Sequence, residues 1–307
     1  MVGLTESVRV GKTPPADNLI EAQFESTRRL RFVTDKLAVY VLLFCALLTL
    51  VPLFSILFEL MRQGLTALNW DFFTKLPKPV GEPGGGMANA IGGTIVILGI
   101  ALAVGFPIGL GTGIYLSEFA GSRYANTIRF LVDVMNGIPS IVYGIFAYTM
   151  FVLPMGGFSA LSGGGALGIM MIPIITRTTE QFLRMVPQNL REAGLALGAP
   201  QWRVILDIVL ASAMGGIVTG VMVALARVAG ETAPLLFTAF GNRYWATNLH
   251  QPIAALSLQI YSYAISPFDD WHRQAWAGAL VLIAMIFLIN LISSYFVSRR
   301  ARMLGKN

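Results

Sequence analysis

Residues 134–176 read VMNGIPSIVYGIFAYTMFVLPMGGFSALSGGGALGIMMIPIIT, and none of these 43 residues carries a charge. A helix that crosses a lipid bilayer needs about 20 largely apolar residues, so this stretch is long enough for two. It is interrupted by Pro154, Gly156 and Gly157 and by the run Gly163–Gly165. Because proline and glycine favour turns, the stretch predicts two membrane-spanning helices, at about 130–154 and 166–184.

The composition of the whole chain supports a membrane protein. Of its 307 residues 55% are hydrophobic and only 12% are charged, and the mean hydropathy is +0.67. Soluble globular domains carry about 25% charged residues, which excludes an ordinary soluble enzyme. We therefore expect an all-α integral membrane protein, in which the charge-poor windows predict six spans: about 37–58, 88–116, 130–154, 166–184, 205–226 and 274–298.

Two further segments are too short or too polar to span a membrane. The uncharged window 244–268 predicts an interfacial helix with flanking loops, because it includes the polar residues Asn248, His250, Gln251 and Gln259. The aromatic segment Trp70–Phe73 suits the headgroup region. In the second span, Gly105 and Gly109 are four residues apart, a spacing that favours close helix packing.

The basic residues predict the orientation of the chain. If the N-terminus is inside, 16 Lys and Arg lie in inner segments and 5 in outer ones, with Arg227 at the end of the fifth span. Cytoplasmic loops are enriched in Lys and Arg, so we expect both termini in the cytoplasm. Residues 1–36 would form a partly disordered cytoplasmic tail, in which 18–36 is either a helix on the membrane surface or a solvated basic segment. The membrane domain would occupy 37–304.

Several patterns suggest chemistry that the chain does not support. Gly11-Lys12-Thr13 matches the end of a nucleotide-binding P-loop, but the glycine required five positions earlier is Glu6. We therefore expect no cofactor and no catalytic residue in this chain, and ATP and Mg on another chain. His250 and His272 are 22 residues apart with no cysteine near them, so we expect no metal site. The net charge of +6 comes from basic residues that gather in the predicted cytoplasmic segments, as in other membrane proteins. We therefore expect no nucleic-acid partner.

The most informative stretch is 187–200, PQNLREAGLALGAP. Pro187 suits the first turn of a helix, Gly198 suits a left-handed cap at its end, and Pro200 prevents its continuation. At helical spacing one face would carry Leu190, Ala193, Gly194 and Leu197. Such a helix, held outside the membrane, fits the groove of a partner protein. An ordinary interfacial loop helix is the alternative.

At these residues the chain resembles the permeases of ATP-binding-cassette (ABC) importers. Glu192-Ala193-Gly194, three residues, Gly198, nine residues and Ile208-Val209-Leu210-Ala211 follow their EAA signature, Glu-Ala-Ala, three, Gly, nine, Ile-x-Leu-Pro. Gly194 and Ala211 depart from that signature, and both are small. The resemblance implies a cytoplasmic coupling helix at 187–199 that docks on a separate ATPase and includes Leu190, Arg191, Glu192, Ala193, Gly194, Leu197, Gly198 and Ala199.

Two more stretches, NGIPSIVYG at 136–144 and GETAPLL at 230–236, resemble the permeases of the phosphate-specific ABC importer, and the second favours its A-type subunit. The resemblance covers about 60–304. It implies the type I importer (MetI-like) permease fold, and half of a pathway for inorganic phosphate across the bacterial plasma membrane. The implied partners are a C-type permease subunit in a heterodimer, two copies of the ATPase subunit, an external phosphate-binding protein and membrane lipid.

Arg227, Glu231 and Thr232 are the predicted phosphate pathway. Arg227 and Glu231 are four residues apart, so on a helix they would share one face. Charges inside a membrane cost about 2.5–3.5 kcal/mol each on insertion scales and are functional candidates. A guanidinium suits an anionic cargo, and the resembled family has both residues in its Arg-x-x-Gly-Glu-Thr motif. A structural ion pair between the two is the alternative.

Asn136, Pro139 and Ser140 are the predicted gate, near the inner end of the third span. Pro139 breaks the helix there, and the two polar side chains would line the inward opening. A simple kink, with its backbone groups satisfied by neighbouring helices, is equally compatible with the sequence.

Two other functions remain open. The chain could be a type I permease for another solute, such as sulfate, molybdate, an amino acid or a sugar. It could also be a channel or secondary transporter that works alone. That class usually relies on broken helices with charges at the midplane, and it needs no docking helix.

Overall fold

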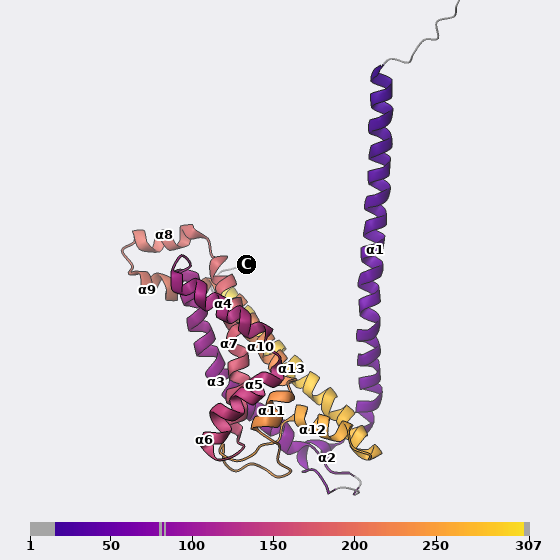
Figure 1. The fold of residues 1–307 in the computed structure, drawn as a ribbon, viewed down its shortest axis with the longest axis vertical. Helices are drawn as coiled ribbons and strands as arrows, with labels where there is room; N and C mark the ends of the chain where they lie inside the picture. The colour runs from indigo at the N-terminus through magenta and orange to yellow at the C-terminus, as the bar shows by residue number, and fades with distance from the viewer. Residues whose placement is uncertain (1–15, 80–81, 83, 304–307) are drawn as a thin grey trace, which may run out of the picture. The chain divides into compact units, whose positions relative to one another are not determined.

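The computed structural model describes residues 16–79, 82 and 84–303, in which all regular secondary structure is helical (Figure 1). Among the described residues five helices are long and apolar enough to cross a membrane, or six if one bent pair counts as a span. The expected all-α membrane fold is therefore confirmed. The chain divides into two units, Met1–Phe58 and Glu59–Asn307.

Helix α1 (Ala16–Ala67) begins in the first unit and ends in the second. The sequence predicted a tail up to residue 36 and a span at 37–58, but the helix runs without a break from Ala16. Between Ala16 and Pro52 there is no proline or glycine, so nothing in the sequence ends the helix at residue 36. The rest of the predicted tail, residues 1–15, lies outside the described residues.

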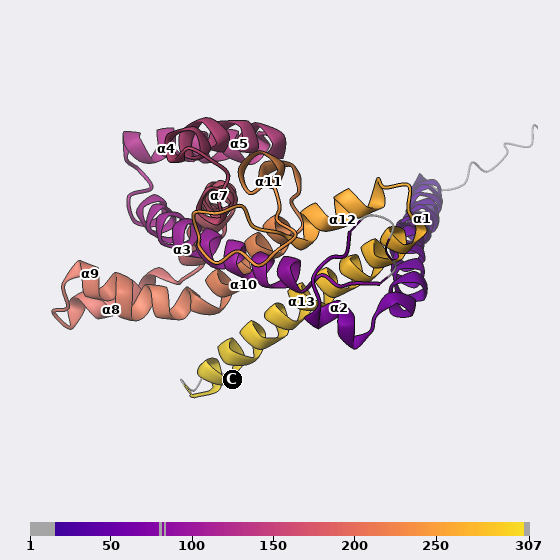
Figure 2. The same cartoon turned by 90° about the horizontal axis from the view of Figure 1, so that it is seen from below.

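The centre of the second unit is the pair α3 (Ala88–Glu118) and α7 (Ala160–Arg184), which cross in close contact (Figure 2). Gly105, Gly109 and Gly113 of α3 face α7. A Cβ atom on Gly109 would lie 2.8 Å from the Cβ of Ile175. The close packing predicted from the glycine spacing is thus confirmed.

Helix α7 corrects the prediction that a turn at Gly163–Gly165 precedes a span at 166–184. The helix begins at Ala160, and the Ser159 hydroxyl caps it by accepting from the Ser162 N–H. The three glycines lie inside the helix, where a Cβ on Gly164 would be 2.5 Å from the Cβ of Ile100. Helix packing, and not a turn, is therefore the reason for glycine here, and the turn lies at Gly156, whose φ is +74°.

The predicted third span, 130–154, is not a single straight helix. Helix α4 (Arg123–Gly137) is followed by α5 (Ser140–Ala147), the π-helical η1 (Tyr148–Val152) and α6 (Leu153–Met155). The two halves are bent by 105°. Pro139 stands at the bend, and because it has no N–H it cannot continue the hydrogen bonding of α4.

The remaining spans begin and end several residues outside their predicted bounds. The fifth predicted span, 205–226, lies within a continuous helical segment made of α9 (Gln201–Arg203), η2 (Val204–Leu210) and α10 (Ala211–Ala229). The sixth, 274–298, lies within α13 (Asp269–Met303).

Four short helices connect the long ones: α2 (Trp70–Thr74), α8 (Gln188–Ala196), α11 (Ala233–Thr238) and α12 (Leu256–Ala264). Helix α12 is the short helix predicted within 244–268, but it packs inside the second unit. Leu256 and Leu258 are buried, and the Leu256 N–H donates to the Thr94 hydroxyl at 2.8 Å. In α2 only Phe72 is buried, whereas Trp70 is 80% exposed.

Candidate functional site

Helix α8 and its cap have the form that the sequence predicted. Pro187 precedes the helix, which ends at Ala196, and Gly198 has a φ of +81°. The Gly198 N–H donates to the Leu195 carbonyl at 2.9 Å, and the Ala199 N–H donates to the Gly194 carbonyl at 3.3 Å. Within the second unit α8 and α9 stand beyond the ends of α3 and α7, away from α11 and α12 (Figure 1). We call this the α8 end.

The predicted face of α8 is divided between two sides of the helix. Gly194 is buried, and a Cβ there would lie 2.7 Å from Ile208 Cδ1 and 3.0 Å from Val204 Cγ2. Leu190 and Leu197 are exposed, Leu197 by 89%, and so is Ala193. Gly194 therefore packs against η2 of its own chain, which also explains why glycine stands where the EAA signature has alanine.

Arg191 also points into its own chain. Its Nη1 lies 2.5 Å from Glu118 Oε1 at the end of α3, and its Nη2 donates to the Leu183 carbonyl of α7 at 3.0 Å. The side chains of Arg191 and Glu118 are only 15% and 7% exposed. Glu192, the next residue, is exposed. Of these two charged residues of α8, only Glu192 is therefore free to meet another protein.

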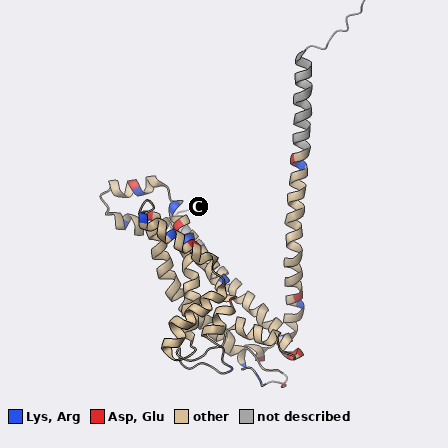
Figure 3. Ribbon diagram, in the orientation of Figure 1, with Lys and Arg blue, Asp and Glu red and all other residues tan. Residues whose placement is uncertain are grey.

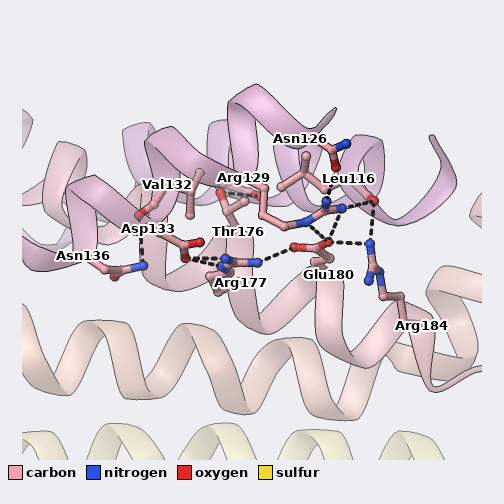
Figure 4. Close-up of polar contacts among 11 residues, drawn as sticks. Leu116, Asn126, Arg129, Val132, Asp133, Asn136, Thr176, Arg177, Glu180 and Arg184 are labelled. Atoms are coloured by element: carbon pink, nitrogen blue, oxygen red, sulfur yellow. Dashed lines mark hydrogen bonds and ion pairs between the residues drawn. The ribbon is translucent and has the colours of Figure 1, made fainter. Parts of the chain in front are cut away.

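A group of charged side chains that we did not anticipate joins α4 to α7 (Figure 4). The Glu180 side chain is 3% exposed and forms three ion pairs. Its Oε1 lies 2.8 Å from both Arg129 and Arg184, and its Oε2 lies 3.1 Å from Arg177. Arg177 also pairs with Asp133 of α4. We call these residues the Glu180 network. The sequence did hold a signal for it, because charged residues within an apolar span are rare and usually paired.

The buried carboxylate of Glu180 holds the Glu180 network together, because three arginines pair with it. Removing one partner of a buried ion pair typically costs about 3–5 kcal/mol, because the remaining charge is left uncompensated. Arg177 and Arg184 are 28% and 47% exposed, so solvent reduces their share of that energy. Most charged residues of the second unit lie toward the ends of its long helices, as the coloured ribbon of Figure 3 shows.

Arg227 and Glu231 do not form the predicted pair on one helical face. Helix α10 ends at Ala229 with Gly230 as its cap, so Glu231 lies beyond the helix. Arg227 is exposed, and the ion pairs among the described residues do not include it. In this structure Arg227 and Glu231 therefore form no ion pair with each other.

The two stretches NGIPSIVYG and GETAPLL pack against each other. A Cβ on Gly144 of α5 would lie 2.9 Å from the Cα of Pro234 in α11. The Asn136 amide donates to the Val132 carbonyl at 3.2 Å, and the Tyr143 hydroxyl donates to the Met135 carbonyl at 2.7 Å. The structure thus joins the region of the predicted gate, with Pro139 and Ser140 at the bend, to the segment after Arg227 that holds the half-buried Thr232.

A pocket of about 270 Å³ lies near α12 and includes Arg243, Gln259, Tyr263 and Trp271 in its lining. The Tyr263 and Trp271 rings stack with centroids 4.4 Å apart, and the Arg243 guanidinium lies 5.8 Å from the Trp271 ring. Burial raises the pKa of the Tyr263 hydroxyl, although Gln259 and Arg243 act in the opposite direction. The pocket lining contains one cation and no carboxylate.

Within the described residues no three His, Cys, Asp or Glu side chains gather as a metal site. The segment that resembles a P-loop, Gly11-Lys12-Thr13, lies outside the described residues.

Comparison with known proteins places the chain among transport proteins. Residues 105–302 match the family described as binding-protein-dependent transport system inner membrane component. The chain is 46% identical to phosphate transport system permease protein PstA of Xylella fastidiosa over 234 residues, 76% of this chain and 81% of that protein. It is 44% identical to PstA of Haemophilus influenzae over 246 residues, 80% of this chain and 87% of that protein.

Solved structures are similar in fold. A chain of the MetNI methionine ABC transporter in an inward-facing conformation matches with a TM-score of 0.58 and 21% identity, over 69% of this chain and 96% of that one. A chain of a bacterial alginate ABC transporter, solved with a pentasaccharide-bound periplasmic protein, matches with a TM-score of 0.59 and 14% identity, over 92% and 98%. The MetI-like fold expected from the sequence is confirmed.

Proposed function

Because the chain belongs to the family of binding-protein-dependent transport system inner membrane components, we propose that it is the permease subunit of an ATP-driven importer of inorganic phosphate. The observation that supports phosphate as the cargo is the 46% identity to a PstA protein over 81% of that protein's length. The chain is a multi-pass inner membrane protein, and a separate ATPase hydrolyses the ATP.

Permeases of this family work with an ATPase and with a substrate-binding protein. For this chain the proposed partners are a C-type permease subunit, two copies of an ATPase subunit that hold ATP and Mg, and an external phosphate-binding protein. The exposed side of α8, with Glu192, Ala193 and Leu197, supports the ATPase contact. These residues project from the α8 end and are not used by the chain's own packing.

The proposed pathway runs past Arg227 and the bend at Pro139. Arg227 is exposed and makes no ion pair among the described residues, so its guanidinium is available to an anion. The contact between Gly144 and Pro234 supports a gate in which the bend and the segment around Thr232 move together.

The test is ATP hydrolysis and uptake by the reconstituted complex with its binding protein. We expect phosphate to stimulate hydrolysis and to accumulate inside proteoliposomes, whereas sulfate and molybdate at the same concentration do neither. Stimulation by sulfate or molybdate alone would instead support a permease for another solute. Uptake by this chain without any ATPase subunit would contradict the proposal.

A further inference from the structure

We propose that Arg191 is a positioning residue, and that its ion pair with Glu118 passes displacement of α8 to the end of α3. This inference rests on the proposed function, in which α8 docks on the ATPase. It separates the roles of neighbouring residues: Glu192 faces the partner, whereas Arg191 connects the docking helix to the membrane helices. The EAA signature by itself would assign both to the ATPase.

The first argument is the direction and burial of the Arg191 side chain. Its two terminal nitrogens contact two different long helices, Glu118 on α3 at 2.5 Å and the Leu183 carbonyl on α7 at 3.0 Å. Leu183 is fully buried and Glu118 is 7% exposed. A guanidinium that is hydrogen-bonded to two helices in this way holds its own helix at a defined distance from both.

The second argument is what else holds α8. Its buried residue, Gly194, contacts Val204 and Ile208 of η2, which follows α8 in the chain. Between α8 and the ends of α3 and α7 lies a pocket of about 530 Å³, lined in part by Ser117, Glu118, Arg184, Gln188, Arg191 and Gln201. Apolar packing therefore does not fill this side of α8. Among the described residues, the Arg191 contacts with Glu118 and the Leu183 carbonyl connect α8 across this pocket to α3 and α7.

The third argument is that the end of α3 is itself connected to other helices, which a movement of α3 would displace. The carbonyl of Leu116, two residues before Glu118, accepts from Arg129 at 3.4 Å and from Arg184 at 3.5 Å. Both arginines bind Glu180 in the network of Figure 4. The end of α3 is thus connected to α4, whose last residue lies just before the bend at Pro139. This series of contacts leads from the docking helix to the proposed gate.

The test is a charge exchange measured in the complete reconstituted complex. We expect Arg191→Glu and Glu118→Arg each to lower phosphate transported per ATP hydrolysed about tenfold, while the ATPase subunit still co-purifies. The double variant, which restores the pair in reverse, should recover most of the coupling, and Arg191→Lys should recover part. Arg123→Glu is the matched control, because Arg123 is exposed, lies five residues after Glu118 and is outside the described ion pairs.

Three outcomes would overturn the proposal. The first is loss of ATPase co-purification in Arg191→Glu but not in Glu118→Arg, which would make Arg191 an ATPase contact. The second is unchanged coupling in both single variants, and the third is an assembled double variant that remains uncoupled. If reversed charges prevent assembly, Glu118→Gln is measured instead and must lower coupling. Failure of the unmodified complex to transport phosphate would contradict the proposed function. That result is distinguishable from the three outcomes above, because it is measured without any substitution.

Discussion

Gly194 and Gly198 are four residues apart in one short segment, but each is glycine for a different physical reason. At Gly194 a side chain would meet Ile208 and Val204, so the requirement is space. At Gly198 an added Cβ would have no atom within 4 Å, but φ is +81°. The requirement there is the backbone conformation, which L-residues other than asparagine and aspartate rarely adopt.

We predict that Gly198→Val destabilises the cap of α8, because a left-handed conformation costs about 1–2 kcal/mol for a residue with a Cβ. The complex should assemble weakly or hydrolyse ATP without transport. Gly198→Asn, which tolerates the conformation, is the control and should keep most of its activity. Phosphate uptake and ATPase activity at matched expression measure the effect, and full uptake by Gly198→Val would show that this cap is not part of the docking element.

The Arg227 side chain is exposed and has no carboxylate partner among the described residues, which leaves its guanidinium available for the proposed pathway role. We predict that Arg227→Gln assembles normally and transports phosphate at least about tenfold more slowly, since it removes a charge-assisted contact to the anion. Arg227→Lys should recover only part, because it lacks the planar fork. Failure of Arg227→Gln to assemble, or uptake at the original rate, would contradict the pathway role.

At the scale of the element, two glycines of α3 show whether a glycine is required by helix packing. On α3, Gly109 faces α7 so closely that an added Cβ would lie 2.8 Å from Ile175, whereas a Cβ on Gly111 would meet no atom within 4 Å. We predict that Gly109→Leu lowers the stability of the purified protein by about 1–3 kcal/mol or prevents its accumulation, because it separates α3 from α7. Gly111→Leu is the matched control. Thermal unfolding in detergent that shows equal losses for both variants would mean that the interface is not the cause.

At the scale of the whole molecule, the uneven distribution of Lys and Arg predicts that both termini and α8 are cytoplasmic. The test uses single cysteines in a Cys45→Ala background, since Cys45 is the only cysteine in the chain. Asn189 and Thr247 are both exposed and lie at α8 and in the loop before α12. In intact cells an impermeant thiol reagent should label Thr247→Cys but not Asn189→Cys. Labelling of position 189 from outside would contradict the orientation.

The sequence alone was enough to determine the features that depend on neighbours in the chain. Apolar runs long enough to cross the bilayer predict the spans of α3 and α13, with ends within several residues. The cap at Gly198 also follows from local chemistry, because a glycine followed two residues later by a proline favours the end of a helix. The resemblance to phosphate permeases was likewise carried by short, contiguous motifs.

Only the tertiary structure decided features that depend on residues far apart in the chain. Glu180 is joined to Arg129, which is 51 residues earlier, and Arg191 to Glu118, which is 73 residues earlier. The glycines of 163–165 suggested a turn, but they lie inside a helix, where Gly163 packs against α11, Gly164 against α3 and Gly165 against η1. Local preferences amount to a few tenths of a kcal/mol up to about 1 kcal/mol per residue, so packing between distant helices overrides them.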